Sequence, residues 1–314
     1  MTRGLAAALL LALLPAPLLA QEPSPSPSPS GTPPPLRLEI DVDVVSITAV
    51  VTDKEGRFVS GLGTKDVEVF EDGVRQEVTF FKEARGGEHV PLSLVLVLDT
   101  SGSMIRTLSF LQEAALSLLS KMEEGDTALL VSFNDSVKAS SEFSGDYDRL
   151  ESYVSGLQAW GGTSLFDAVH YGLNRVRDQP GRKAVIVFSD GADTTSSMKE
   201  QEVTDYAKAV EATVYSVGFK GEGGFFARGP RGFLRGIARD TGGSFYDPSK
   251  VGDVLRTFSA IADELQHHYL LAYTPLRAPD GTFRTIQVKV KRPNTEVKVR
   301  TGYFSVKRKK RPVR

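Results

Sequence analysis

The chain has 314 residues, a formal charge of -1 and no cysteine. This length allows about two domains, and the lack of cysteine excludes disulfides, thiolate metal sites and a cysteine nucleophile. The balanced charge gives no reason to expect a nucleic-acid partner.

The N-terminus has the features of a secretory signal peptide. Arg3 precedes an unbroken apolar run from Leu5 to Leu14, and Ala20 offers a small residue for cleavage. We expect residues 1–20 to be removed, so that the mature protein is exported to the periplasm or the extracellular space. The alternative is an uncleaved anchor, which the short run and the prolines that follow it disfavour.

A spacer and a β segment come next. Residues 21–35 are rich in serine and proline, a composition that forms an extended linker and no core. Apolar and polar residues then alternate, which predicts several β-strands over residues 36–88. Within this segment we expect a hairpin with strands Val67–Phe70 and Val74–Phe81.

Residues 90–265 alternate short apolar strands with amphipathic helices. This pattern is typical of an α/β domain with a doubly wound, mainly parallel, Rossmann-like sheet. Such sheets bind ligands at the carboxyl ends of their strands, so we expect a site on the loops there. The expected strands are Leu92–Leu98, Ala128–Phe133, Ala184–Phe188, Thr213–Gly218 and Ser244–Tyr246, with an edge strand near Val137–Phe143.

The period-two pattern returns in residues 266–306 and predicts further strands. These strands are too few to form a stable domain alone. We therefore expect them to complete the N-terminal β segment, so that the α/β domain is inserted into a small antiparallel β-sandwich. Two separate β modules are the alternative. The basic tail, residues 307–314, could contact an anionic membrane surface, although such tails are more often simply solvated.

Oxygen donors follow two predicted strands and precede one predicted helix. Asp99, Ser101 and Ser103 alternate on the loop after the first strand, where residues two apart can point the same way. Thr163 precedes a helix, and Asp190 follows a later strand. A parallel sheet would bring all of them to one edge, where their hard oxygens suit Mg²⁺. Each short motif taken alone also fits an ordinary turn.

With these residues the chain resembles the von Willebrand factor type A domain and its metal-ion-dependent adhesion site. Asp99, Ser101 and Ser103 match the Asp-x-Ser-x-Ser positions of the family, and Thr163 and Asp190 match its other two donors. The resemblance implies Mg²⁺ or Mn²⁺, held with one open position. It further implies that a Glu or Asp carboxylate of a protein partner fills this position.

The resemblance covers about residues 91–265, and the β segments on either side look like those of a bacterial exported subgroup. It implies an adhesion-type binding protein and not an enzyme. Two alternatives stay open: a scaffold whose metal only holds loops together, and a Mg²⁺-dependent phosphoryl transferase or hydrolase. The enzyme is disfavoured because no Lys or His is evidently placed as a base or a charge clamp.

A glycine-rich loop after a later strand is a candidate partner contact, because aromatic and arginine side chains are common in interface hot spots. The candidate contact residues are Phe225, Phe226, Arg228 and Arg231. A plain connection between elements is the alternative. Trp160 could line the metal loop or simply pack against it.

Overall fold

The computed structural model describes residues 44–84, 90–190, 192–219, 229–248, 250 and 252–306. The predicted signal peptide, the spacer, the start of the N-terminal β segment and the basic tail lie outside the described residues. Within the described part, the structure has no helix that is both long and apolar enough to span a membrane.

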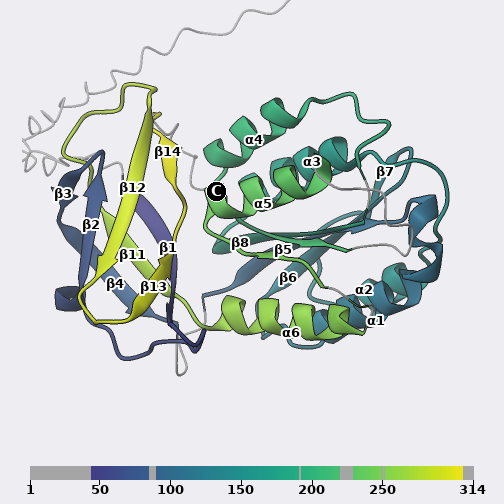
Figure 1. Cartoon of the computed structure of the whole chain (residues 1–314), viewed down its shortest axis with the longest axis horizontal. Coiled ribbons are helices and arrows are strands. Elements are labelled where there is room, and N and C mark those ends of the chain that lie inside the picture. The colour runs from purple at the N-terminus through teal and green to yellow at the C-terminus, as the bar shows by residue number, and fades with distance from the viewer. Residues whose placement is uncertain are drawn as a thin grey trace, which may run out of the picture. The chain divides into compact units, whose positions relative to one another are not determined.

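A six-stranded sheet forms the centre of the α/β part, in the order β10-β9-β8-β5-β6-β7 (Figure 1). The short strand β7 pairs antiparallel with β6, and the other neighbouring strands are parallel. The predicted doubly wound sheet is therefore confirmed. Its strands are β5 (Leu92–Asp99), β6 (Thr127–Phe133), β7 (Val137–Ala139), β8 (Arg182–Ser189), β9 (Thr213–Gly218) and β10 (Phe245–Tyr246).

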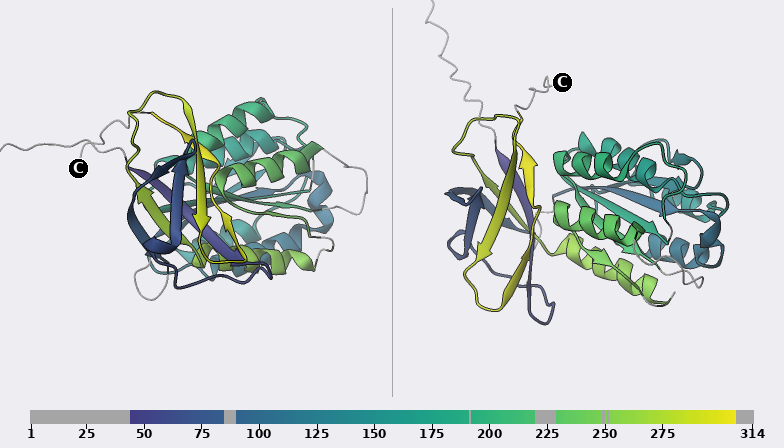
Figure 2. Two further views of the ribbon diagram at one scale, coloured as in Figure 1. Left: turned by 60° about the vertical axis from the view of Figure 1, so that its left-hand side comes forward. Right: turned by 45° about the horizontal axis from the view of Figure 1, so that its top comes forward.

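Helices cover both faces of this sheet (Figures 1 and 2). One face carries α1 (Leu108–Leu119), α2 (Tyr147–Ser155) and α6 (Asp253–Gln266). The other carries α3 (Leu165–Arg177), α4 (Glu200–Ala209) and α5 (Gly229–Thr241). The helices bury two apolar clusters, and alternate side chains of β5 point into one or the other because successive strand residues face opposite sides.

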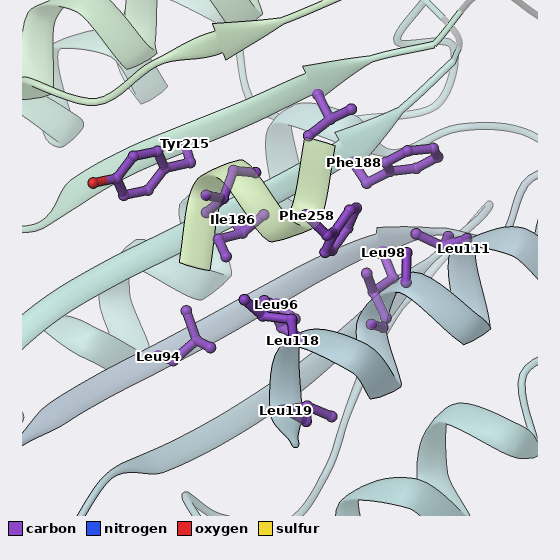
Figure 3. Close-up of a cluster of buried hydrophobic side chains, with 14 of the residues drawn as sticks. Leu94, Leu96, Leu98, Leu111, Leu118, Leu119, Ile186, Phe188, Tyr215 and Phe258 are labelled. Carbon is purple, nitrogen blue, oxygen red and sulfur yellow. The ribbon is translucent and has the colours of Figure 1, made fainter. Parts of the chain in front are cut away.

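The cluster beneath α1 and α6 fixes the strand ends from which the candidate site begins (Figure 3). Leu98 of β5, Leu111 of α1, Phe188 of β8 and Phe258 of α6 are at most 1% exposed. The rings of Phe188 and Phe258 lie 6.1 Å apart between centroids. Close packing of this kind leaves little freedom to the neighbouring backbone, so the loops after β5 and β8 start from fixed points.

The N- and C-terminal segments together form two antiparallel sheets with the orders β13-β1-β11-β4 and β14-β12-β2-β3. Each sheet mixes strands from both segments, and both sheets contribute to one apolar cluster. The predicted insertion of the α/β domain into a β-sandwich is therefore confirmed. The strands are β1 (Val45–Asp53), β2 (Val67–Glu71), β3 (Val74–Gln76), β4 (Val78–Glu83), β11 (Tyr269–Tyr273), β12 (Phe283–Val290), β13 (Thr295–Lys298) and β14 (Gly302–Phe304).

The hairpin prediction is wrong in its second strand. The segment Val74–Phe81 is divided at Glu77, where the chain passes from one sheet to the other. β3 pairs with β2, whereas β4 pairs with β11. Alternating patterns continue on both sides of this crossing, so periodicity alone does not reveal a change of sheet. The edge strand expected near Val137–Phe143 is likewise shorter, since β7 ends at Ala139.

Candidate metal-binding site

Asp99 ends β5 and is 0% exposed. Its Oδ1 accepts a hydrogen bond from the backbone N of Ser101 at 2.8 Å, and its Oδ2 accepts one from Ser189 Oγ at 2.6 Å. These bonds attach the carboxylate both to the loop after β5 and to the end of β8. Ser101 then precedes a short 3₁₀ helix, η2 (Gly102–Arg106).

Hydroxyl groups connect the loop after β5 with the loop after β8. Ser101 Oγ and Ser103 Oγ lie 3.0 Å apart, and Ser103 Oγ donates to Asp190 Oδ1 at 2.7 Å. Four of the predicted donors, Asp99, Ser101, Ser103 and Asp190, thus form one connected group. Ser101 is buried and Ser103 is exposed, so the group leads from the core to the surface.

The loop that carries Thr163 is bonded to the loop after β5. Gly102 N donates to Gly161 O at 3.0 Å, and Trp160 N donates to Thr100 O at 2.9 Å. Thr163 itself is buried, and its Oγ1 makes no hydrogen bond with another described residue. The fifth predicted donor is therefore on a loop held against the other four, with its hydroxyl oxygen available.

The conformation of this loop requires a glycine at position 161. Its φ is +76°, a region that other residues rarely adopt. A side chain there would also meet the carboxylate of Asp135, whose Oδ1 accepts a hydrogen bond from Gly162 N at 2.8 Å. Asp135 would have to move away, which would break the bond that holds the loop.

Three residues that support the site were not identified from the sequence: Ser189, Asp135 and Thr194. Thr194 Oγ1 accepts a hydrogen bond from the backbone N of Thr163 at 2.9 Å. A signal existed for Ser189, which directly precedes Asp190 at the end of a buried strand. For Asp135 and Thr194 there was none, because their loops approach the site only in the folded structure.

The carboxylates of Asp99 and Asp190 have no basic partner among the described residues. Burial raises the pKa of Asp99 to about 6, against the hydrogen bonds from Ser101 and Ser189, which lower it; the nearby charge of Asp190 also raises it. Burial raises the pKa of Asp190 as well. Within the described ranges, no Lys, Arg or His side chain forms an ion pair with either carboxylate. A cation at this place would remove the cost of burying them.

The donor set fits a hard divalent cation. Carboxylate and hydroxyl oxygens are the ligands that Mg²⁺ and Mn²⁺ prefer. Asp99, Ser101, Ser103, Thr163 and Asp190 would hold such an ion. Because three of these groups are neutral, the ion would keep part of its charge and attract a further anion.

The structure describes only one of the four predicted partner-contact residues. Phe225, Phe226 and Arg228 lie outside the described residues. Arg231 belongs to α5 and forms an ion pair with Asp247 at 2.6 Å. The role of all four in partner binding stays a prediction.

Comparisons with known proteins agree with this architecture. Residues 94–193 match the family model described as the von Willebrand factor type A domain. A von Willebrand factor type A structure from Catenulispora acidiphila covers 85% of this chain and 74% of that chain, with 11% identity and a TM-score of 0.50. At this identity the similarity concerns the fold.

Two further solved structures are similar to this chain over a shorter length. The vWF domain of the type V pili tip protein Mfa5 from Porphyromonas gingivalis has 14% identity and a TM-score of 0.48, covering 57% of this chain and 96% of that chain. The PilB minor pilin from Streptococcus sanguinis has 16% identity and a TM-score of 0.49, covering 58% and 63%. No match is found among curated proteins. The family model and the sheet topology together show that this chain contains a von Willebrand factor type A domain.

Proposed function

We propose that the type A domain binds Mg²⁺ or Mn²⁺ and, through the ion, a carboxylate of a protein partner. The proposed ligands are Asp99, Ser101, Ser103, Thr163 and Asp190. The observation that carries the proposal is the connected donor group, which contains two carboxylates and no basic partner among the described residues. Buried carboxylates in such a setting are stabilised by a cation.

A bound ion would supply an electrophilic centre at the surface. Asp99 and Ser101 are buried, whereas Ser103 is exposed and Asp190 is half-buried. A partner carboxylate can therefore approach from the side of Ser103 and Asp190. An uncharged partner group would gain less from the ion, because the attraction is electrostatic.

We further propose that this binding takes place outside the cytoplasm. The predicted signal peptide of residues 1–20 supports export. The lack of cysteine fits an oxidising compartment, because the chain cannot form wrong disulfides there.

A peptide-display selection tests the proposal. The purified chain is incubated with random peptides in Mg²⁺, and bound peptides are eluted with EDTA. We expect each recovered peptide to contain a Glu or Asp whose replacement by Gln or Asn abolishes binding. The Asp99→Asn variant should recover none. The Asp263→Asn variant is the matched control, because Asp263 is an exposed carboxylate of α6.

The two alternatives give other results. A purely structural ion would raise the melting temperature in Mg²⁺ without recovering any metal-dependent peptide. An enzyme would hydrolyse generic phosphate esters in Mg²⁺ and lose this activity in Asp99→Asn. Peptides that bind equally well in EDTA, or that bind Asp99→Asn, would contradict the proposal.

A further inference from the structure

A polar groove adjoins the metal-site loops on the side of β6, β7 and α2. It has a volume of about 730 Å³, and Thr100, the residue after Asp99, contributes to its lining. The carbonyl oxygen of Thr100 accepts a hydrogen bond from Trp160 N at 2.9 Å, and Trp160 lines the groove as well. The groove, which we call the Trp160 groove, thus shares a loop with the candidate metal site.

Trp160 is the single tryptophan of the chain and is 51% exposed. Lys138 Nζ lies 5.8 Å from the centroid of its ring. In the described part of the chain, no carboxylate pairs with Lys138, and no Asp or Glu lines the groove. A half-exposed tryptophan beside an uncompensated cation is a combination that suits the binding of an acidic, partly apolar segment.

The inner wall of the groove is polar and held in place by its own hydrogen bonds. Ser132 Oγ and Tyr153 OH lie 3.0 Å apart. Asn134 is 5% exposed, and its Oδ1 accepts a hydrogen bond from the backbone N of Ser136 at 3.1 Å. The side-chain hydrogen bonds of Asn134 with other described residues go to its Oδ1 and leave its Nδ2 free to donate. A nearly buried amide donor is therefore ready for a ligand that enters the groove.

We propose that the Trp160 groove binds the part of the partner that flanks the metal-bound carboxylate. It selects an extended segment with a second acidic residue and an apolar or aromatic side chain. The second carboxylate pairs with Lys138, the apolar side chain packs on Trp160, and Asn134 donates to a backbone carbonyl. This inference rests on the proposed function, because the first carboxylate is taken to be at the ion.

Charge favours an acidic peptide over a neutral saccharide. A sugar ring would also stack on Trp160, but it would leave Lys138 unpaired. Lys138 has no carboxylate in the groove lining, and the ion, although held by Asp99 and Asp190, would keep an open position for an anion. A segment with two acidic residues satisfies both centres at once.

The peptide-display selection tests the role of the Trp160 groove when it is repeated with groove variants. The variants are Trp160→Ala and Lys138→Glu, with Phe80→Ala and Lys289→Glu as matched controls on the sandwich. Phe80 is an aromatic side chain that is 50% exposed. Lys289 Nζ lies 4.8 Å from the ring centroid of Phe70, so it reproduces the setting of Lys138. The Mn²⁺ affinity is measured first and is expected to be the same in all four variants.

We expect the peptides recovered by the natural chain to carry a second acidic residue. They should bind Trp160→Ala about tenfold more weakly and Lys138→Glu about fivefold more weakly, with no change in the controls. Selection on Lys138→Glu should enrich Lys or Arg at the position of the second acid. Binding should also change the fluorescence of the single tryptophan of the natural chain.

Three results would overturn the inference. Metal-dependent peptides that bind both groove variants with the same affinity as the natural chain would show that the groove does not bind the partner. This result would leave the proposed function intact. Neutral glycans that bind the natural chain but not Trp160→Ala, with no effect on peptides, would assign the groove to saccharides. A selection that yields no metal-dependent peptide would contradict the groove and the proposed function together.

Discussion

Ser103 Oγ donates a hydrogen bond to Asp190 Oδ1 at 2.7 Å, although the two residues are 87 positions apart in the chain. The same hydroxyl lies 3.0 Å from Ser101 Oγ. One exposed side chain thus connects the loop after β5 with the loop after β8. This connection is possible because β5 and β8 are parallel neighbours whose carboxyl ends lie at the same edge of the sheet.

Replacement of this hydroxyl should weaken metal binding without unfolding the domain. Because Ser103 is exposed, Ser103→Ala removes a donor and little packing. We expect the Mn²⁺ affinity to fall at least about tenfold, as found when groups that hold or orient a metal are removed. Calorimetric titration with MnCl₂ measures the effect, and circular dichroism checks the fold. An unchanged affinity would exclude Ser103 from the ligand set.

The stability of the metal-free protein should depend on pH through Asp99. Its folded-state pKa is raised from 3.8 to about 6, so folding favours the protonated form. This contribution is complete below the unfolded pKa and is lost as the pH rises through the folded pKa. In EDTA, the free energy of unfolding should therefore decrease by up to about 3 kcal/mol over this interval, relative to Asp99→Asn.

Urea unfolding of both proteins at several pH values measures this difference. Saturating Mg²⁺ at neutral pH should restore stability to the natural chain and not to Asp99→Asn. Parallel pH profiles of the two proteins in EDTA would show that folding does not raise the pKa of Asp99.

The conformation of Gly161 should matter more than that of a glycine with the same backbone angle elsewhere. Gly161 and Gly56 have φ of +76° and +80°, but only Gly161 would bring a side chain against Asp135, since nothing lies within 4 Å at Gly56. We expect Gly56→Ala to cost about 1 kcal/mol and Gly161→Ala at least about 1 kcal/mol more. Mn²⁺ titration should show weaker binding in Gly161→Ala only. Equal effects of the two substitutions would refute the role given to Asp135.

The sandwich contains a buried ion pair whose removal should be costly. Arg284 is 0% exposed, and its Nη1 lies 3.1 Å from Glu71 Oε1. Glu71 Oε2 also accepts hydrogen bonds from Tyr273 OH and Tyr303 OH, both at 2.8 Å. Glu71→Ala leaves the buried guanidinium without its buried carboxylate, so we expect a loss of about 3–5 kcal/mol in the free energy of unfolding.

A pair with greater solvent exposure provides the comparison for this substitution. Arg75 Nη2 lies 3.3 Å from Glu68 Oε1 near the surface of the same sheet. Glu68→Ala should cost less than about 1 kcal/mol, because solvent screens such pairs. Chemical unfolding measures both variants, and similar losses would show that burial of Glu71 contributes little.

The α/β part and its donors were predictable because they depend on short-range patterns. An apolar run such as Leu92–Leu98 predicts a buried parallel strand, and the structure has β5 over Leu92–Asp99. Once the strands are parallel, the residues after them must share one edge. This rule alone places Asp99 and Asp190 near each other, without knowledge of any contact.

Other features depend on contacts that no local pattern encodes. Asp135 supports the site from a loop after β6, where a lone acidic residue is unremarkable in sequence. The crossing at Glu77 lies inside one continuous alternating pattern. The buried pair of Glu71 and Arg284 joins residues 213 positions apart, and charged residues in strands ordinarily indicate a solvent-exposed face.

The central claim is that the connected donor group holds a divalent ion, and a direct Mn²⁺ titration at neutral pH tests it. The natural chain and Asp263→Asn should each bind a single Mn²⁺ per chain, detected by calorimetry and by loss of the free-ion electron paramagnetic resonance signal. Asp99→Asn should not bind it under the same conditions. Equal binding by all three proteins, or no binding by the natural chain, would contradict the account.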